Sequence, residues 1–291
     1  MLISASRRTD IPAFYSEWLI NRINAGYCLV QNPMNPAQIR RVSLLPEDVG
    51  GLVLWTKNAA PMLDKLAAIE RFAYYFQYTI TPYDTDVESG LANKQSIVIP
   101  TFVELAARIG ADRVIWRYDP ILITRRYSVD YHIRAFSRLC ELLAGSTQKC
   151  VISFADMYKS IAKTMRGIGY TELSFGDKQS LAARLLKIAE EYNIELCACC
   201  EPLEIHELGI GQSACVDAAL IGKIAGTPPL NIPRDRNQRA NCNCTQSVDI
   251  GAYNSCMNGC RYCYANHSES RVRANFARHN PAAEMLLDIK P

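Results

Sequence analysis

Apolar residues follow two alternating patterns along most of the chain. Short runs of β-branched and aromatic residues alternate with longer segments in which apolar residues recur at helical spacing. This alternation is typical of βα units that build a parallel sheet. The short runs predict strands at 2–6, 27–31, 52–56, 74–79, 113–118, 150–154 and 194–199, with an eighth strand near Val216.

The longer segments predict helices between these strands and one extended loop at 82–95. Seven or eight units of about 35 residues each favour a (β/α) barrel, TIM-like or nearly complete. A Rossmann-type sheet is the main alternative, but no Gly-x-Gly-x-x-Gly follows the first strand. The helices are expected at 13–25, 61–72, 97–110, 130–143, 157–167, 178–192 and 216–225.

The pattern ends near Gly226. The following residues are rich in Pro, Arg, Asn and Cys and have little periodicity until about Ser268. We therefore expect a barrel domain at 1–226 and an irregular cysteine-rich segment at 227–291 that packs on it. Apolar burial alone would hardly order such a segment, so a metal cluster is a reasonable organiser. The tail at 269–289 is mixed in character, with some helical pattern.

Composition narrows the class of protein. With 291 residues and 49% hydrophobic content, the chain can bury a substantial core. No apolar leader and no uninterrupted apolar run of about 18 residues is present, so a cytoplasmic protein without a membrane partner is expected. A net charge of +3 does not by itself imply a nucleic-acid partner. Twelve cysteines in such a protein indicate metal ligands or buried thiols rather than disulfides.

The cysteines near the C-terminus have the most informative spacing. Cys256, Cys260 and Cys263 form a Cys-x3-Cys-x2-Cys run with Tyr262 before the last thiol. Three thiolates on one loop can hold three corners of a [4Fe-4S] cluster and leave the fourth iron open. A zinc site would instead pair Cys242 and Cys244 with two of the later thiols. That arrangement leaves one cysteine over, so the spacing favours iron–sulfur.

Cys242 and Cys244 leave a second question open. If either supplies a fourth thiolate, the cluster is closed and acts as an electron carrier or a structural staple. If neither does, the open iron remains, and the two cysteines bind a second metal or reach the substrate. The earlier Cys197, Cys199 and Cys200 lie in an apolar run and are expected to be small buried thiols.

Polar residues interrupt the apolar strands at their carboxyl ends, where (β/α) barrels collect catalytic groups. Lys57 and Arg117 directly follow apolar runs, so each is expected to meet a carboxylate or an anionic ligand. Arg117 and Asp119 are two residues apart on a strand and should point the same way. Asp10 is also a helix N-cap candidate. The candidate catalytic residues are Asp10, Lys57, Arg117, Asp119 and Glu201.

The Cys256–Cys263 motif, with its aromatic Tyr262, resembles the signature of the radical S-adenosylmethionine (SAM) superfamily. The resemblance implies that the open iron chelates SAM, and that one electron cleaves SAM to methionine and a 5′-deoxyadenosyl radical. It also implies cofactor-binding roles for Arg7, Arg8 and Tyr262, with a forked arginine suited to the carboxylate of SAM. In that superfamily the motif normally follows the first strand, whereas here it follows the last.

The chain from residues 3–12 to 263–265 also resembles a bacterial family of unknown function, the "domain of unknown function eighteen forty-eight", which ends in such a cysteine cluster. The leading hypothesis is a radical SAM-like enzyme with a small-molecule substrate and an electron donor. A non-catalytic iron–sulfur or zinc module is the second. A nucleic-acid-acting protein is the third and would use the arginines around the cysteines, Arg234, Arg236, Arg239, Arg271, Arg273 and Arg278.

Overall fold

A computed structural model describes residues 1–239 and 241–287. In these residues the main sheet has eight strands, all parallel, in the order β10-β1-β4-β5-β6-β7-β8-β9. Apart from β10, neighbours in the sheet follow one another along the chain, as repeated βα crossovers require. The strands are β1 (Leu2–Ala5), β4 (Gly51–Thr56), β5 (Tyr74–Thr79), β6 (Val114–Ile121), β7 (Lys149–Phe154), β8 (Glu195–Ala198), β9 (Gly211–Gln212) and β10 (Val248–Asp249).

The α/β class and the large parallel sheet are therefore confirmed, but the strand predicted at 27–31 is not part of that sheet. It forms β2 (Tyr27–Asn32), which pairs antiparallel with β3 (Asn35–Ser43) in a separate two-stranded sheet. The two strands are joined by a turn too short for the crossover that a parallel neighbour needs. Seven of the nine residues of β3 are exposed, so this hairpin lies at the surface.

The eighth strand of the sheet also differs from the prediction. The segment near Val216 is not itself a strand, and the short β9 precedes it. The edge beside β1 is completed by β10, which comes from the segment predicted to be irregular. Its two residues pair with the middle of β1, Val248 opposite Ile3 and Asp249 opposite Ser4. The cysteine-rich segment thus contributes a strand to the main sheet.

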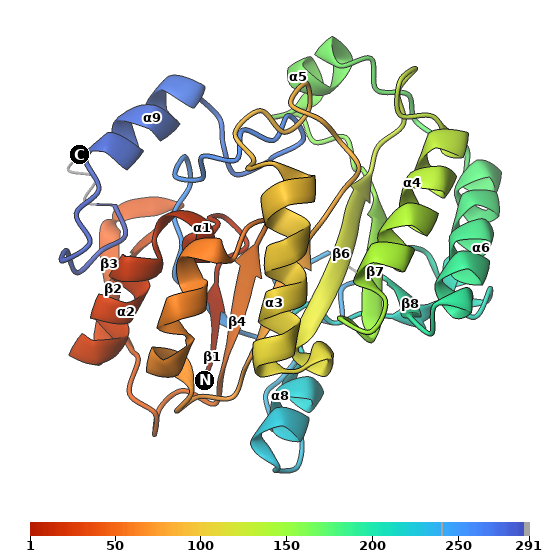
Figure 1. Ribbon diagram of the computed structural model, residues 1–291. Helices are drawn as coiled ribbons and strands as arrows, with labels where there is room; N and C mark the ends of the chain where they lie inside the picture. The colour runs from red at the N-terminus through yellow and green to blue at the C-terminus, as the bar shows by residue number, and fades with distance from the viewer. Residues whose placement is uncertain (240, 288–291) are drawn as a thin grey trace.

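The helices lie near their predicted positions, and Figure 1 shows η1, α3, α4 and α6 on the same side of the sheet. Asp10 accepts a hydrogen bond from the Ala13 backbone and caps α1, as predicted. The predicted helix at 61–72 is a 3-10 helix, η1. The bounds are α1 (Ile11–Phe14), α2 (Ser16–Ala25), η1 (Ala60–Ile69), η2 (Lys94–Val98), α3 (Ile99–Ile109), η3 (Ala111–Arg113), α4 (Val129–Leu143), α5 (Ala162–Gly167), α6 (Phe175–Glu191), α7 (Leu203–His206), α8 (Ala218–Ala225) and α9 (Glu269–Ala277).

The two faces of the sheet bury separate groups of side chains, because successive residues of a strand point to opposite faces. Leu52 and Leu54 of β4 pack in the large core beneath the helices, whereas Val53 packs in a second cluster. Six strands contribute to that second cluster, so this face of the sheet is also buried. Its strand residues are Leu2, Val53, Tyr75, Ile115, Val151 and Cys197.

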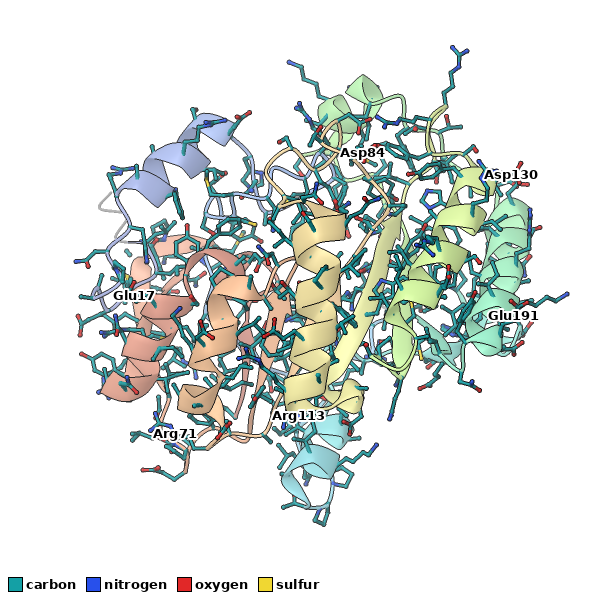
Figure 2. The ribbon with its side chains drawn as sticks, viewed as in Figure 1. Glu17, Arg71, Asp84, Arg113, Asp130 and Glu191 are labelled. Atoms are coloured by element: carbon teal, nitrogen blue, oxygen red, sulfur yellow. The ribbon has the colours of Figure 1, made fainter. Side chains whose placement is uncertain are left out.

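The two ends of the strands carry different segments. At the amino ends of the strands, α8 packs its buried Ile221 into this second cluster, here called the inner cluster. A Cβ on Gly51 would lie 2.5 Å from Ile221 Cδ1, so the helix and β4 are in close contact. At the opposite end lie α5, α9 and the chain that joins β10 to α9 (Figure 1). Figure 2 labels Arg113 near the amino ends and Asp84 near the carboxyl ends.

In the part of the chain that the structure describes, no helix combines the length and the apolarity needed to cross a membrane. The predicted tail at 269–289 is helical only at Glu269–Ala277, and its last residues lie outside the described ones.

Candidate functional site

Residues 256–263, here called the three-cysteine loop, lie over the carboxyl ends of β1 and β4. The residue before the loop is held by two side chains from the β1 end. Tyr15 Oη donates to the Ser255 carbonyl at 2.7 Å, and the hydroxyls of Thr9 and Ser255 are 2.6 Å apart. Within the loop, Asn258 Nδ2 donates to Asp10 Oδ2 at 2.9 Å. The C-terminal motif is therefore in contact with the first strand despite its distance in sequence.

The three-cysteine loop also packs against the 82–90 loop that follows β5. Gly90 N donates to Asn258 O at 3.0 Å, and Arg261 N donates to Val87 O at 2.9 Å. A Cβ on Gly90 would lie 2.0 Å from the Met257 carbonyl oxygen, so a side chain has no room there. Gly259 has a φ of +64°, a backbone conformation that favours glycine. Close backbone packing therefore sets the shape of the cysteine motif.

A buried carboxylate, Glu88, lies beside this motif. It accepts hydrogen bonds from Lys57 Nζ at 2.8 Å, Lys94 Nζ at 2.5 Å and Thr81 Oγ1 at 2.7 Å, and another from the Tyr262 hydroxyl. Burial alone would raise the pKa of Glu88, but the two lysines lower it to about 2. Glu88 is therefore ionised at neutral pH.

Lys57 is a cation that interacts electrostatically with the cysteine motif. Burial alone would lower its pKa, but the charges of Glu88 and Cys260 raise it above the ordinary value, so Lys57 stays protonated. Its Nζ also lies 5.6 Å from the centre of the Tyr262 ring. The prediction that Lys57 meets a carboxylate is confirmed by the ion pair with Glu88.

The three thiols are partly exposed and free of disulfides. Desolvation raises the pKa of Cys256 to about 12 and also raises that of Cys260 and Cys263, whereas Lys57 acts in the opposite direction on the latter two. Since metals bind thiolates, such thiols need a strongly bound cation to be deprotonated at neutral pH. Among residues 1–239 and 241–287, no three His, Cys, Asp or Glu side chains form a ready-made group for a metal ion.

Asp10 joins β1, β4 and the three-cysteine loop. Besides Asn258, its carboxylate accepts from Lys57 N at 2.7 Å and from Ala13 N at 3.1 Å. Burial raises its pKa above the ordinary value, against the effect of these hydrogen bonds. Asp10, Lys57 and Tyr262 of the predicted site are thus brought together around the motif.

A second group of predicted residues lies on the face of the sheet that bears the inner cluster. Arg117 donates through Nε to Asp119 Oδ1 at 2.9 Å and forms a second bond to the same carboxylate, so the two side chains point the same way as predicted. Arg117 Nη1 also donates to Cys215 Sγ at 2.9 Å. The guanidinium groups of Arg7 and Arg117 lie 5.6 and 5.2 Å from the centre of the Trp55 ring.

Cys242 and Cys244 belong to this second group. Cys215 N donates to Cys244 Sγ at 3.3 Å, and Cys244 N donates to Cys242 Sγ at 3.4 Å. Their thiols also interact with those of Cys215 and Cys200. The thiols of this pair thus contact cysteines that follow β8 and β9, and Cys200 among them was expected to be a small buried thiol.

The two remaining predicted residues have structural partners. Arg8 forms an ion pair with Asp249 at 3.0 Å and lies over the Tyr253 ring. Glu201 Oε1 accepts from the Phe154 backbone at 2.8 Å, and burial raises the pKa of this carboxyl. Two of the arginines near the cysteines also form ion pairs, Arg239 with Asp156 and Arg273 with Glu269.

Sequence reasoning missed Glu88, Lys94, Asp249 and Cys215. Glu88 and Lys94 lie in the stretch predicted as a long loop, and a single acid in a loop has no distinguishing pattern. Asp249 receives bonds from Arg8 and from the hydroxyls of Ser4 and Ser6, at 3.1 and 2.6 Å. Its signal was its position within the short apolar run Val248–Ile250.

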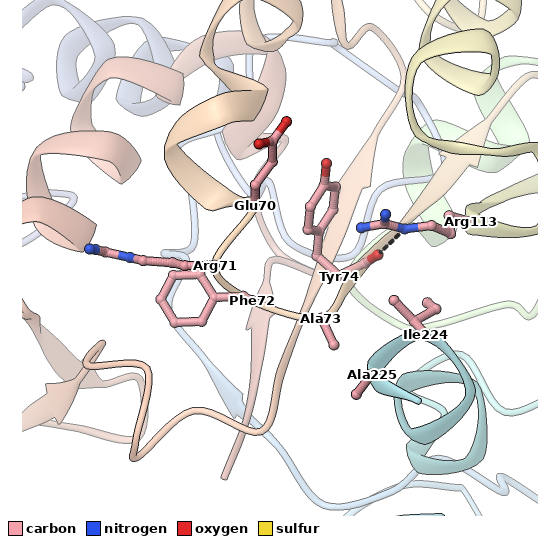
Figure 3. A pocket seen from close by; sticks show the side chains of 8 residues that line it. All are labelled: Glu70, Arg71, Phe72, Ala73, Tyr74, Arg113, Ile224 and Ala225. Carbon is pink, nitrogen blue, oxygen red and sulfur yellow. Dashed lines mark hydrogen bonds between the residues drawn. The ribbon is translucent and has the colours of Figure 1, made fainter. Parts of the chain in front are cut away.

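A surface pocket lies at the other end of the molecule. It is lined by residues before and at the start of β5 and by the end of α8, and Arg113 Nε donates there to the Tyr74 carbonyl at 3.0 Å (Figure 3). Because these residues lie at the amino ends of the strands, the pocket is separate from the candidate site.

Neither the curated proteins nor the solved structures gave a match to this chain. A family model matches residues 2–265, which include every strand of the main sheet and the whole three-cysteine loop. The chain therefore belongs to the family described as Domain of unknown function (DUF1848).

Proposed function

We propose that the chain is an iron–sulfur enzyme in which Cys256, Cys260 and Cys263 hold a [4Fe-4S] cluster and leave one iron open for SAM. The observation that carries this proposal is the Cys-x3-Cys-x2-Cys loop over the carboxyl ends of β1 and β4, beside a buried, charged Lys57. In (β/α) enzymes this end of the strands is where catalytic groups gather.

The residues present fit such a cluster. A cubane is bound by thiolates that each ligate a different iron, so its ligands need not converge on one point. Gly90 and Gly259 allow the motif to lie close to the 82–90 loop, and Asp10 fixes it through Asn258. Lys57 brings a positive charge that offsets the negative charge of the thiolates.

The environment of Cys242 and Cys244 supports an open iron. Their recorded partners are Cys200 and Cys215, not the thiols of the three-cysteine loop. With neither supplying a fourth thiolate, one corner of the cluster stays free for a ligand from solution.

When bound, the reduced cluster would supply one electron, which in the superfamily that the motif resembles cleaves SAM to methionine and a 5′-deoxyadenosyl radical. Lys57, Glu88 and Tyr262 form a hydrogen-bonded cluster beside the motif, in which Glu88 also pairs with Lys94. Lys57 interacts electrostatically with the Cys260 thiol of the motif. We therefore assign the positive charge facing the cofactor to Lys57.

We further infer that the sheet closes into a barrel around the inner cluster. Tyr75 Oη and Gln77 Nε2 of β5 donate to the Cys215 carbonyl, at 2.8 and 2.9 Å. Thr245 N donates to Val216 O at 2.8 Å, between the segments that follow β9 and precede β10. These contacts support a barrel with a seam between its two shortest strands.

The test is anaerobic reconstitution of the full chain with iron and sulfide. We expect about four irons per chain, an EPR signal of the reduced cluster that changes when SAM is added, and 5′-deoxyadenosine when a chemical reductant supplies electrons. Cys260→Ala removes one ligand and is expected to lower iron content and abolish 5′-deoxyadenosine. Cys140→Ala is the matched control, because Cys140 lies on α4 and is buried in the large core, among residues outside the motif.

The results of this reconstitution distinguish a SAM-cleaving enzyme from a non-catalytic iron–sulfur protein. Four irons with an EPR spectrum that SAM does not change, and no 5′-deoxyadenosine, would indicate a non-catalytic cluster. A chain that takes up no iron, or a Cys260→Ala variant that keeps the full complement, would overturn the proposal as a whole.

A further inference from the structure

A second group of thiols lies at the gap between β9 and β10. Cys199 and Cys200 follow β8, Cys215 follows β9, and Cys242 and Cys244 precede β10. We call these five residues the seam thiols. Cys199 Sγ lies 3.2 Å from Cys215 Sγ and 3.8 Å from Cys200 Sγ.

The contacts run around all five residues. The Cys215 thiol interacts with that of Cys244, which interacts with that of Cys242, and Cys242 in turn interacts with Cys200. Four of the five are buried, and Cys200 is the partly exposed one, with a φ of +59° that takes the chain out of the strand. Cysteines from three separate segments thus form one ring of contacts.

The charges around the ring are those that a thiolate group requires. Arg117 Nη1 donates to Cys215 Sγ at 2.9 Å, and Arg7 interacts with Cys244. Arg7 Nη2 is buried and has no hydrogen-bond partner. A buried cation is costly unless a negative group lies near it, and neutral thiols are weak acceptors. Two arginines directed at sulfur therefore indicate a site built for negative charge.

The spacing of the sulfurs distinguishes a single ion from a cubane. Four sulfurs bound tetrahedrally to one zinc at about 2.3 Å stand roughly 3.8 Å apart. Cys199 Sγ and Cys215 Sγ are already 3.2 Å apart, within about 0.6 Å of that spacing. Because the described thiols form a ring and do not yet converge on one point, binding would require rotation of cysteine side chains. A cysteine has only one torsion before sulfur, so each thiol can be redirected by rotation about χ1 alone.

We propose that Cys199, Cys215, Cys242 and Cys244 bind one zinc ion, which joins the segments after β8 and β9 to the segment before β10. Cys200 remains outside the coordination sphere. The ion has a structural role, since four thiolates leave no open position for substrate. This site is independent of the cluster proposed for the three-cysteine loop, because the two use different cysteines.

The test is metal analysis of the full chain, expressed with both zinc and iron available and purified without oxygen. We expect about one zinc per chain, with zinc X-ray absorption that fits four sulfur ligands at about 2.3 Å. Cys215→Ser and Cys244→Ser are expected to lose at least nine-tenths of the zinc, and Cys200→Ser, the matched control, to retain it. A variant with Cys256, Cys260 and Cys263 all changed to Ala is expected to keep its zinc.

A measurement on the unmodified chain covers the case in which the serine variants do not fold. Titration with a mercurial that blocks thiols should release zinc, and refilling with Co²⁺ should give the thiolate charge-transfer absorption of a tetrahedral site. Wild-type protein without zinc, zinc retained in both Cys215→Ser and Cys244→Ser, or zinc lost from the triple alanine variant but not from these two would overturn the proposal.

Discussion

His132 is buried in the first turn of α4, and its ring is hydrogen-bonded at both nitrogens. Nδ1 lies 2.8 Å from the Tyr118 hydroxyl, and Nε2 lies 3.0 Å from the Leu122 carbonyl. The carbonyl can only accept, so Nε2 carries the proton and Nδ1 accepts from Tyr118. Burial lowers the pKa of His132 from 6.5 to about 4. Between about pH 4 and pH 6.5, His132 is therefore neutral in the folded protein but protonated in the unfolded chain.

This difference predicts a pH-dependent contribution to stability. Because the folded pKa is depressed, the contribution is fully present above pH 6.5 and is lost as the pH falls toward about 4. Between pH 7.5 and 5 the wild type should lose about 2 kcal/mol through this residue. Urea unfolding of wild type and His132→Gln at both pH values measures it.

The variant is expected to be less stable at pH 7.5, since it loses buried hydrogen bonds, but its free energy of unfolding should fall less on acidification. Parallel pH dependence in the two proteins would show that His132 does not titrate in this range.

At the scale of elements, two loops meet over the carboxyl ends of the strands. The three-cysteine loop and the 82–90 loop exchange backbone hydrogen bonds at Gly90 and Arg261, and their contact leaves no room for a side chain on Gly90. Glu88 lies in the same loop and forms ion pairs with Lys57 and Lys94. The shape of the cysteine motif thus depends on a segment that carries no recognisable motif of its own.

Gly90→Ala is therefore expected to displace the three-cysteine loop. The added Cβ would lie 2.0 Å from the Met257 carbonyl, and such overpacking costs about 1–3 kcal/mol. Iron uptake on reconstitution should fall together with the melting temperature. Gly167→Ala is the matched control, because Gly167 ends α5 with no heavy atom within 4 Å of an added Cβ.

The control should be neutral or slightly stabilising, as expected for alanine in place of glycine in a helix. Equal stability and iron uptake in the two variants would contradict the close contact between the loops.

At the scale of the whole molecule, one face of the parallel sheet buries the inner cluster, and α8 contributes Ile221 to it. Ile221 of α8 is buried against Gly51 and belongs to the same cluster as Val53 and Tyr75. The opposite end carries the C-terminal segment (Figure 1). The inner cluster thus lies between the amino ends of the strands, which α8 covers, and the carboxyl ends, which bear the candidate site.

Ile221→Ala is expected to lower the free energy of unfolding by about 3 kcal/mol, because it leaves a cavity in the inner cluster. Ile39→Ala is the control, since Ile39 lies on the hairpin strand β3 and is 51% exposed. Its effect should stay within about 0.5 kcal/mol. Urea unfolding curves of the two variants compare them directly, and an equal loss in both would mean that α8 does not close the inner cluster.

The sequence by itself determined the features that depend on local spacing. Alternating apolar runs and helical periodicity predicted the parallel α/β sheet, because the apolar positions of each segment show which of its residues are buried. The Cys256–Cys263 spacing placed three thiols on one loop, whatever the rest of the chain does. Asp10 as a helix cap, and the pairing of Arg117 with Asp119, followed from positions two or three residues apart.

Only the tertiary structure decided which distant segments meet. It paired β10 with β1, moved the strand at 27–31 into a separate hairpin, and joined Lys57 to Glu88. It also assembled Cys199, Cys215 and Cys244, with Arg117 beside Cys215, away from the three-cysteine loop. Such contacts arise from packing between segments that are far apart in the chain, and local periodicity carries no information about them.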